Sequence, residues 1–281
     1  MALTLSPALL VGVSLAFGLS LGSPSAAQTP QAAEIPGPQA TAPSPEAPDP
    51  SLSPECRVPG SKLYTLAKLK AVKKALREHR AVHVLTIGGS TSGGLGAAAS
   101  YPVKLEDALT RSFPDVEVEV DSRGVSGEIA FGAAERLRTM VAEIEPDLVV
   151  WQVGGNDALA RVEIEGFAQS LAETVAWIKS HGIDVVLVDP QYTASLAKDD
   201  YYNHFVQAIQ KVAASEQVPL VQRYEAMRYL AARAKGEAVA GAGFRLADLG
   251  YRCMAEHVTR AITVSLLQPD VTGSTSPAAA H

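Results

Sequence analysis

Three short segments of the sequence carry residue types that acyl transfer requires. Ser90 follows two glycines at the end of an apolar run and offers a hydroxyl nucleophile. Gly127 offers a backbone N–H with no Cβ to obstruct approach, and Asn156 offers a side-chain amide. Together with the N–H of Ser90, these donors suit the oxyanion that develops on an attacked carbonyl. The three segments therefore indicate serine-dependent chemistry at an acyl group.

The elements that must position these residues are predicted strands. Apolar or alternating runs precede the three residues over Val82–Ile87, Val116–Val120 and Asp147–Val153. The carboxyl ends of parallel strands meet at one edge of a sheet, where open α/β sheets bind ligands. Taken singly, the glycines would be turn residues and the asparagine a helix cap. Their arrival at one edge favours the chemical role.

The remaining patterns predict the fold class. Further apolar strands are expected over Ile183–Val188 and Val218–Val221. Helical spacing predicts helices over Leu63–Arg80, Val103–Phe113, Ile129–Ile144, Phe167–Ser180, Asp200–Ser215, Ala226–Lys235 and Ala247–Leu267. Alternation of helices with buried strands is typical of a parallel sheet covered on both faces. We therefore expect an α/β fold, a flavodoxin-like three-layer α/β/α sandwich with a five-stranded parallel sheet.

The composition of both ends of the chain indicates that they lie outside the predicted domain. Leu9–Leu21 is apolar but shorter than the roughly 20 residues that span a bilayer, and Ser25-Ala26-Ala27 suits signal peptidase. We expect a signal peptide over residues 1–27, a Pro/Ala-rich disordered linker over 28–55, a domain over 56–267 and a disordered tail over 268–281. This organisation predicts a periplasmic or secreted protein without stable membrane insertion after cleavage, and an uncleaved anchor is the alternative.

The net charge and the cysteine content restrict the classes of ligand and partner that we expect. The net charge of −6 and the pI near 5.6 argue against nucleic-acid binding. No metal-ligand cluster of histidines and cysteines is visible in the sequence, and Gly-x-Gly-x-x-Gly and phosphate-cradling loops are missing, so we expect no metal and no cofactor. Cys56 and Cys253 are the two cysteines, and in an exported protein they are expected to form a disulfide rather than two buried thiols. The oligomeric state is not predicted.

The three segments together resemble conserved blocks of a known family. Gly88-Gly89-Ser90, Gly127 in Arg-Gly-Val-Ser-Gly, and Gly154-Gly155-Asn156-Asp157 are similar to blocks one, two and three of the SGNH (GDSL-type) hydrolases. Gly89 stands where that family often has aspartate. The resemblance implies a flavodoxin-like fold and hydrolysis of esters, including lipid, carbohydrate-acetyl and thioester substrates. A small-molecule or polysaccharide ester is therefore the expected substrate.

The last block departs from the family pattern. The family takes its base from an Asp-x-x-His element before the final helix, often followed by Gly-Tyr. Gly250-Tyr251 is present here, but counting back places Ala242 at the acid position and Arg245 at the base position. A guanidinium stays protonated and cannot accept the serine proton. His204 follows a strand's carboxyl end and is the one histidine that could substitute, although a surface helix position is its ordinary interpretation. Asp248 is expected to cap or orient the last helix.

Two hypotheses follow from this departure. In the first, the chain is an exported esterase or deacetylase in which Ser90 acts with a substitute base or at a much reduced rate. In the second, the fold is a catalytically inactive pseudo-esterase. Arg245 then lies beside Asn156 and the Gly127 amide, an arrangement suited to an anionic or carbohydrate ligand.

Overall fold

The apolar runs of the sequence form one mixed sheet in the computed structural model of the chain, which describes residues 47–89, 100–233 and 248–269. The spatial order of the strands is β1-β6-β5-β4-β2-β3. Their bounds are β1 (Tyr64–Thr65), β2 (Val82–Ile87), β3 (Val118–Ser122), β4 (Leu148–Gln152), β5 (Asp184–Val188) and β6 (Leu220–Val221). Strands β2 to β6 pair in parallel, and β1 pairs antiparallel with β6. The sheet therefore has six strands and not the five expected.

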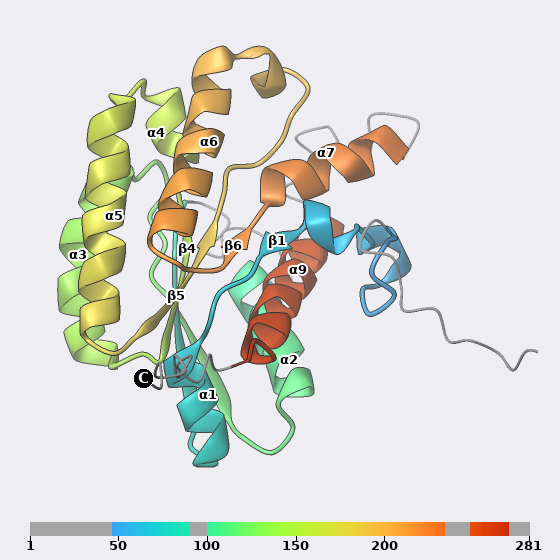
Figure 1. Cartoon of the computed structure of the whole chain (residues 1–281), viewed down its shortest axis with the longest axis vertical. Coiled ribbons are helices and arrows are strands. Elements are labelled where there is room, and N and C mark those ends of the chain that lie inside the picture. Colours follow the sequence, from blue (N-terminus) through green and yellow to red (C-terminus); the bar gives the residue numbers. More distant parts are fainter. Residues whose placement is uncertain (1–46, 90–99, 234–247, 270–281) are drawn as a thin grey trace, which may run out of the picture. The chain divides into compact units, whose positions relative to one another are not determined.

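Helices cover both faces of the sheet (Figure 1). Their bounds are α1 (Lys70–Arg77), α2 (Tyr101–Ser112), α3 (Ala130–Ile144), α4 (Gly155–Leu159), α5 (Ile164–Ser180), α6 (Asp200–Ser215), α7 (Arg223–Arg233) and α9 (Asp248–Leu266). Short 3₁₀ turns, η1 to η3, occur at Pro54–Cys56, Gly60–Lys62 and Leu196–Lys198. Buried residues of α3, α5 and α6 pack on one face of the sheet, and those of α1, α2 and α9 pack on the other. This is the predicted three-layer α/β/α arrangement.

The sixth strand lies within a segment expected to be helical. The helix predicted over Leu63–Arg80 forms only at Lys70–Arg77, and Tyr64–Thr65 before it is strand β1. Leu63 is fully buried and its carbonyl accepts a hydrogen bond from the Gln222 N–H at 2.7 Å, which draws the segment against β6. A two-residue strand has no readable periodicity, so only this long-range contact decides its conformation.

Two smaller differences concern the site-bearing loops. Strand β3 begins two residues later than expected, because the ladder pairs Val118 with Val82 at the start of β2. The Gly-Gly-Asn-Asp segment was expected to be a loop, but its second glycine, Gly155, opens the short helix α4. Both shifts keep the predicted loops at the carboxyl ends of their strands.

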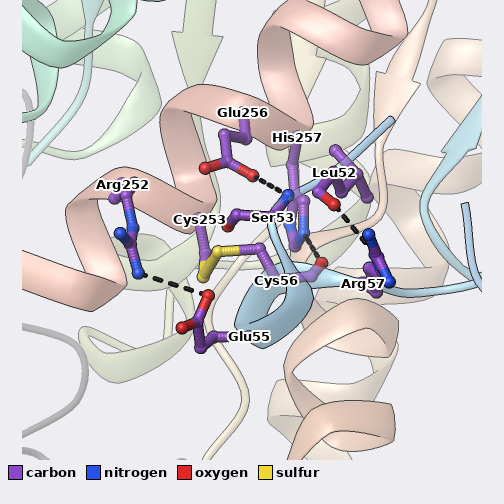
Figure 2. Close-up of a disulfide and its surroundings, with 9 residues drawn as sticks. All are labelled: Leu52, Ser53, Glu55, Cys56, Arg57, Arg252, Cys253, Glu256 and His257. Carbon is purple, nitrogen blue, oxygen red and sulfur yellow. Dashed lines mark hydrogen bonds and ion pairs between the residues drawn. A yellow bond between two sulfur atoms is a disulfide. The ribbon is translucent and has the colours of Figure 1, made fainter. Parts of the chain in front are cut away.

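A disulfide joins Cys56 to Cys253, as predicted, across 197 residues of sequence. Figure 2 shows polar contacts beside it: the Ser53 N–H donates to the Glu256 carboxylate at 2.8 Å, and His257 Nε2 donates to the Cys56 carbonyl at 2.7 Å. Residues 47–62, which we call the N-terminal strap, are thus held against α9. Burial lowers the pKa of His257, so its imidazole is neutral when it makes this bond.

The packed part of the chain begins earlier than the boundary expected from the sequence. The linker was predicted to run to residue 55, but Leu52 is 3% exposed and packs with Ala226 and Leu230 of α7. Asp49 forms an ion pair with Arg260 of α9 at 2.6 Å. Pro- and Ser-rich composition predicts little burial, yet one leucine and one carboxylate in the strap are enough to dock it.

Within the described residues, no helix is both long and apolar enough to cross a membrane.

Candidate active site

Three loops meet at the carboxyl edge of the sheet, following β2, β3 and β4. The loop after β3 lies along the end of β2. Its Arg123 N–H donates to the Thr86 carbonyl at 3.0 Å, and its Val125 N–H donates to the Gly88 carbonyl at 3.0 Å. The loop is therefore bound to the backbone that leads directly into Ser90.

Asn156 connects all three loops. Its side-chain Nδ2 donates to the Glu128 carbonyl at 2.8 Å, which ties the loop after β4 to the loop after β3. A β-carbon built on Gly89 would lie 3.3 Å from the same nitrogen, so the loop after β2 also passes against the amide. An asparagine amide has two N–H donors. One is used by Glu128, and the bond fixes the plane in which the other lies.

The residues on either side of Asn156 explain why its loop holds this shape. Gly154 has φ +89°, a conformation that favours glycine, and it forms the N-cap of α4. Asp157 is buried, and its carboxylate accepts the Ala130 N–H at the start of α3 at 2.9 Å. Burial raises the pKa of Asp157, while hydrogen bonds from backbone N–H groups lower it. Gly154 and Asp157, which flank the Gly155-Asn156 pair, thus fix the position of the asparagine.

Gly127 lies in the exposed part of the loop after β3. Its φ is +77°, and within the described part of the chain no atom beyond Gly127 and its two chain neighbours lies within 4 Å of the place where a β-carbon would be. Among the described residues its N–H has no hydrogen-bond acceptor. Gly127 and Asn156 come from loops joined by the bond to Glu128, so two of the three predicted site residues lie in neighbouring, hydrogen-bonded segments. Ser90, the third, falls outside the described residues.

A cavity of about 190 Å³ opens at this edge of the sheet. Gly88, Gly89 and Asn156 form part of its wall, and Ala133, Trp151 and Tyr202 contribute side chains from α3, β4 and α6. The lining mixes apolar groups with carboxamides and carboxyl groups, among them Gln152, Gln191 and Glu128. Such a cavity can hold a small polar group with a short apolar part.

Local sequence patterns do not single out Tyr202 and Gln191, which line the cavity, or Asp189, which directly precedes the lining residue Pro190. The Tyr202 hydroxyl donates a hydrogen bond to the backbone carbonyl of Gln191 at 2.8 Å. Tyr202 falls at an ordinary apolar position of a predicted helix, so its pattern indicates core. Asp189 follows β5 directly and is fully buried; burial raises its pKa to about 8, and its Oδ1 accepts the Tyr224 N–H at 2.8 Å. A carboxylate directly after an apolar strand was the available signal for this residue.

The structure describes only part of the last block, in which the sequence departs from the family pattern. Ala242 and Arg245 fall outside the described residues. Asp248 is the first residue of α9 and forms an ion pair with Lys104 of α2 at 2.7 Å. This pairing agrees with the orienting role expected for Asp248.

No histidine within the described ranges lines the cavity. His204 is exposed on α6. His83 pairs with Glu119 at 3.1 Å, and His181 lies against Trp177 at the end of α5. No group of three or more histidine, cysteine or carboxylate side chains in the described part of the chain is arranged to hold a metal ion.

Comparisons with known proteins agree with this geometry. Residues 55–267 match the family described as Non-GDSL lipase-like. Esterase TesA of Pseudomonas aeruginosa strain PAO1 is 30% identical over 140 residues, covering 49% of this chain and 68% of the relative. An arylesterase of Vibrio mimicus is 29% identical over 140 residues, with the same coverage of 49% and 68%.

Two solved structures are similar in fold. A crystal structure of TesA has a TM-score of 0.53 and 24% identity, covering 66% of this chain and 99% of that chain. The acetylxylan esterase Axe2 of Geobacillus stearothermophilus has a TM-score of 0.57 and 18% identity, covering 64% and 94%. These likenesses establish the fold as a flavodoxin-like α/β/α sandwich.

Proposed function

The chain belongs to the Non-GDSL lipase-like family, and from this premise we propose that it is an exported serine ester hydrolase. Its nucleophile is Ser90, and its oxyanion hole contains the Gly127 N–H and the Asn156 side-chain amide. One observation carries the proposal: Asn156 Nδ2 lies 2.8 Å from the Glu128 carbonyl and 3.3 Å from the β-carbon position of Gly89. The amide is therefore fixed between the loop of Gly127 and the residue that precedes Ser90.

The proposed reaction is acyl transfer through a covalent intermediate. Ser90 Oγ forms a bond to the ester carbonyl carbon, and the oxygen of that carbonyl gains negative charge. The second N–H of the Asn156 amide and the Gly127 N–H stabilise this charge as it develops. The bond to the alcohol then breaks, and the alcohol takes up the proton that Ser90 Oγ lost on attack. Water then hydrolyses the ester between the acyl group and Ser90, which releases the acid and returns a proton to Ser90 Oγ.

The proton that Ser90 loses on attack requires an acceptor. Arg245 stands where the family has its histidine, and an arginine cannot accept a proton at neutral pH. Without a histidine base, an oxyanion hole and substrate binding alone give roughly 10³- to 10⁴-fold acceleration over water. We therefore propose slow turnover. His204, the histidine that the sequence suggested as a substitute base, is exposed on α6 and does not line the cavity.

The cavity supports a short acyl group on a small-molecule or carbohydrate alcohol. Its volume of about 190 Å³ leaves little room for a long chain within the described wall. The structural neighbour Axe2 is an acetylxylan esterase, and the sequence relatives are an arylesterase and an esterase. The proposed substrates are accordingly acetyl or other short-chain esters. The disulfide and the signal-like N-terminus support action in the periplasm or outside the cell.

A second candidate function is favoured by the substituted last block. With Ala242 and Arg245 in place of aspartate and histidine, the pocket would bind an anionic or carbohydrate ligand without hydrolysing it. Both candidates use the same Asn156 and Gly127 donors, so they differ in turnover and not in location.

The deciding experiment compares the wild-type domain with Ser90→Ala on p-nitrophenyl acetate. Hydrolysis by the wild type above the Ser90→Ala rate is expected, with Asn156→Ala lowering kcat by about 10²- to 10³-fold. Equal rates for wild type and Ser90→Ala would overturn the hydrolase proposal and leave the binding function.

A second pair of changes tests the last block. The double variant Ala242→Asp with Arg245→His restores the family pattern and is expected to raise kcat by about 10²- to 10⁴-fold, the usual contribution of a general base. The same double variant on a Ser90→Ala background is the matched control and should gain nothing. A gain that persists without Ser90 would contradict the assigned nucleophile.

A further inference from the structure

Arg136 on α3 contacts both ends of the loop that carries Gly127. Its Nε and Nη2 donate to the two carboxylate oxygens of Glu128, at 2.6 and 2.7 Å. Its Nη2 also donates to the backbone carbonyl of Arg123 at 2.9 Å. We propose that Arg136 is a positioning residue that sets the geometry of the oxyanion hole without touching the substrate. This inference rests on the proposed function.

Arg136 is important for this loop because few other contacts among the described residues fix the position of its central part. Residues Val125, Ser126 and Gly127 are exposed. Among the described residues, only Gly127 itself and its chain neighbours come within 4 Å of its β-carbon position. The Val125 N–H is tied to the Gly88 carbonyl, and the Glu128 N–H is 3.3 Å from the Val125 carbonyl. The direction of the Gly127 N–H therefore depends on where the two ends of the loop, at Arg123 and Glu128, are fixed.

Arg136 also influences the second proposed oxyanion donor, the Asn156 side-chain amide. Glu128 binds Arg136 through its carboxylate and accepts Asn156 Nδ2 through its backbone carbonyl at 2.8 Å. A shift of Glu128 would thus move the acceptor that orients the Asn156 amide and the residue next to Gly127. One guanidinium in this way sets both proposed oxyanion donors.

The geometry requires an arginine. The planar guanidinium presents a fork that binds both oxygens of a carboxylate and still has an N–H for the Arg123 carbonyl, which a lysine ammonium cannot match in one fixed plane. The hydrogen bond to Glu128 raises the pKa of Arg136. The Glu128 side chain is only 11% exposed, so the pair is partly shielded from solvent. Because the two charges offset each other, the role is positional and not a field on the oxyanion.

The same fold supplies a matched control. Arg80 binds Asp147 through two nitrogens, at 3.0 and 2.7 Å. The side-chain exposures of that pair are 44% and 9%, close to the 36% and 11% of Arg136 and Glu128. The Arg80 pair lies at the amino ends of β2 and β4, opposite the site. It has similar chemistry and burial but no contact with the Gly127 loop.

The first test measures steady-state kinetics on p-nitrophenyl acetate for Arg136→Gln, Arg136→Lys and Arg80→Gln. Arg136→Gln is expected to lower kcat at least 10-fold with KM changed less than twofold, because the oxyanion forms only in the transition state. Arg136→Lys should recover part of the loss. Arg80→Gln should lower the melting temperature to a similar extent and leave kcat unchanged. An unchanged kcat in Arg136→Gln would overturn the inference.

The second test does not need turnover. Amide hydrogen exchange over residues 123–128 should be at least 10-fold faster in Arg136→Gln than in wild type, and unchanged in Arg80→Gln. Unchanged exchange would overturn the inference even if kcat falls, because the arginine would then act by charge and not by position. If the wild type shows no Ser90-dependent hydrolysis, the proposed function fails while exchange still decides whether Arg136 holds the loop.

Discussion

Asp157 accepts a hydrogen bond from the backbone N–H of Ala130 at 2.9 Å. The last residue of the Gly-Gly-Asn-Asp segment thereby caps the first turn of α3, a helix that begins 27 residues earlier in the sequence. The helix itself has no side-chain cap from its own N-cap residue, Ile129. The segment that supplies Asn156 therefore also fixes the helix that carries Arg136.

Replacing Asp157 should destabilise the fold. Asp157→Ala leaves a buried N–H without its acceptor and is expected to lower the free energy of unfolding by about 1–3 kcal/mol. Asp157→Asn retains an acceptor oxygen and should cost less. Urea unfolding of both variants checks this, and equal losses would show that the hydrogen bond is not the cause.

Gly154 should not tolerate a side chain. A β-carbon there would lie 2.5 Å from Ile209 Cδ1, and φ is +89°. The backbone strain is expected to cost about 1–3 kcal/mol in Gly154→Ala, with part of the steric loss relieved by adding Ile209→Val.

The neighbouring glycine is the control for this prediction. A β-carbon on Gly155 would meet only Pro190 Cβ, at 4.0 Å, in ordinary contact. Gly155 opens α4, so Gly155→Ala should change the stability by less than about 0.5 kcal/mol. Equal melting temperatures for the two alanine variants would contradict the strain argument.

The disulfide should contribute strongly to stability. It closes a loop of 197 residues, and the chain-entropy relation gives about 5 kcal/mol for a loop of this size, an upper value. We expect Cys56→Ser with Cys253→Ser to lower the free energy of unfolding by about 2–5 kcal/mol. Guanidinium unfolding with and without reductant measures this, and reductant should not affect the double variant.

A surface contact beside the disulfide provides the comparison. Arg252 and Glu55 form an ion pair at 3.5 Å, with side chains 44% and 54% exposed (Figure 2). Exposed pairs of this kind contribute little. Arg252→Gln should change stability by less than about 0.5 kcal/mol, and a loss as large as that of the cysteine variant would assign the stability to the strap's ion pair.

Stability should fall as the pH rises from about 4 to about 6, owing to Asp184. Its carboxylate accepts the Lys70 and Val72 N–H groups at the start of α1, yet burial raises its pKa to about 6 from a usual value of 3.8. The folded state then binds the proton more tightly than the unfolded state, so the contribution is present below pH 4 and is lost as pH rises through 6.

Asp184→Asn removes this titration. The variant should show a flatter dependence of the unfolding free energy between pH 4 and 6, by on the order of 1–3 kcal/mol over the interval. Urea unfolding at several pH values gives the comparison. An unchanged slope would mean that another group titrates in that interval.

The sequence determined the sheet and the meeting of the loops. Runs such as Val82–Ile87 and Leu148–Gln152 are apolar on both faces, which is possible only in a strand covered by helices on two sides. Parallel pairing then forces the segments after them to one edge. The expectation that Gly127 and Asn156 lie at the same edge of a three-layer fold follows from this pattern. The strand order β4-β2-β3, which makes their loops neighbours, was decided by the tertiary structure.

Only the tertiary structure decided the contacts that no local pattern encodes. Three contacts are of this kind: Tyr64–Thr65 pairs with β6, Leu52 packs on α7, and the Arg136 guanidinium binds the Glu128 carboxylate. In each case the residues that flank the contact in the sequence do not predict its partner. A two-residue strand has no period, and a charged residue on a helix surface has the same local pattern whether it faces water or a loop. Periodicity reports which face of an element is buried, but the partner of each polar group depends on the folded chain's three-dimensional path.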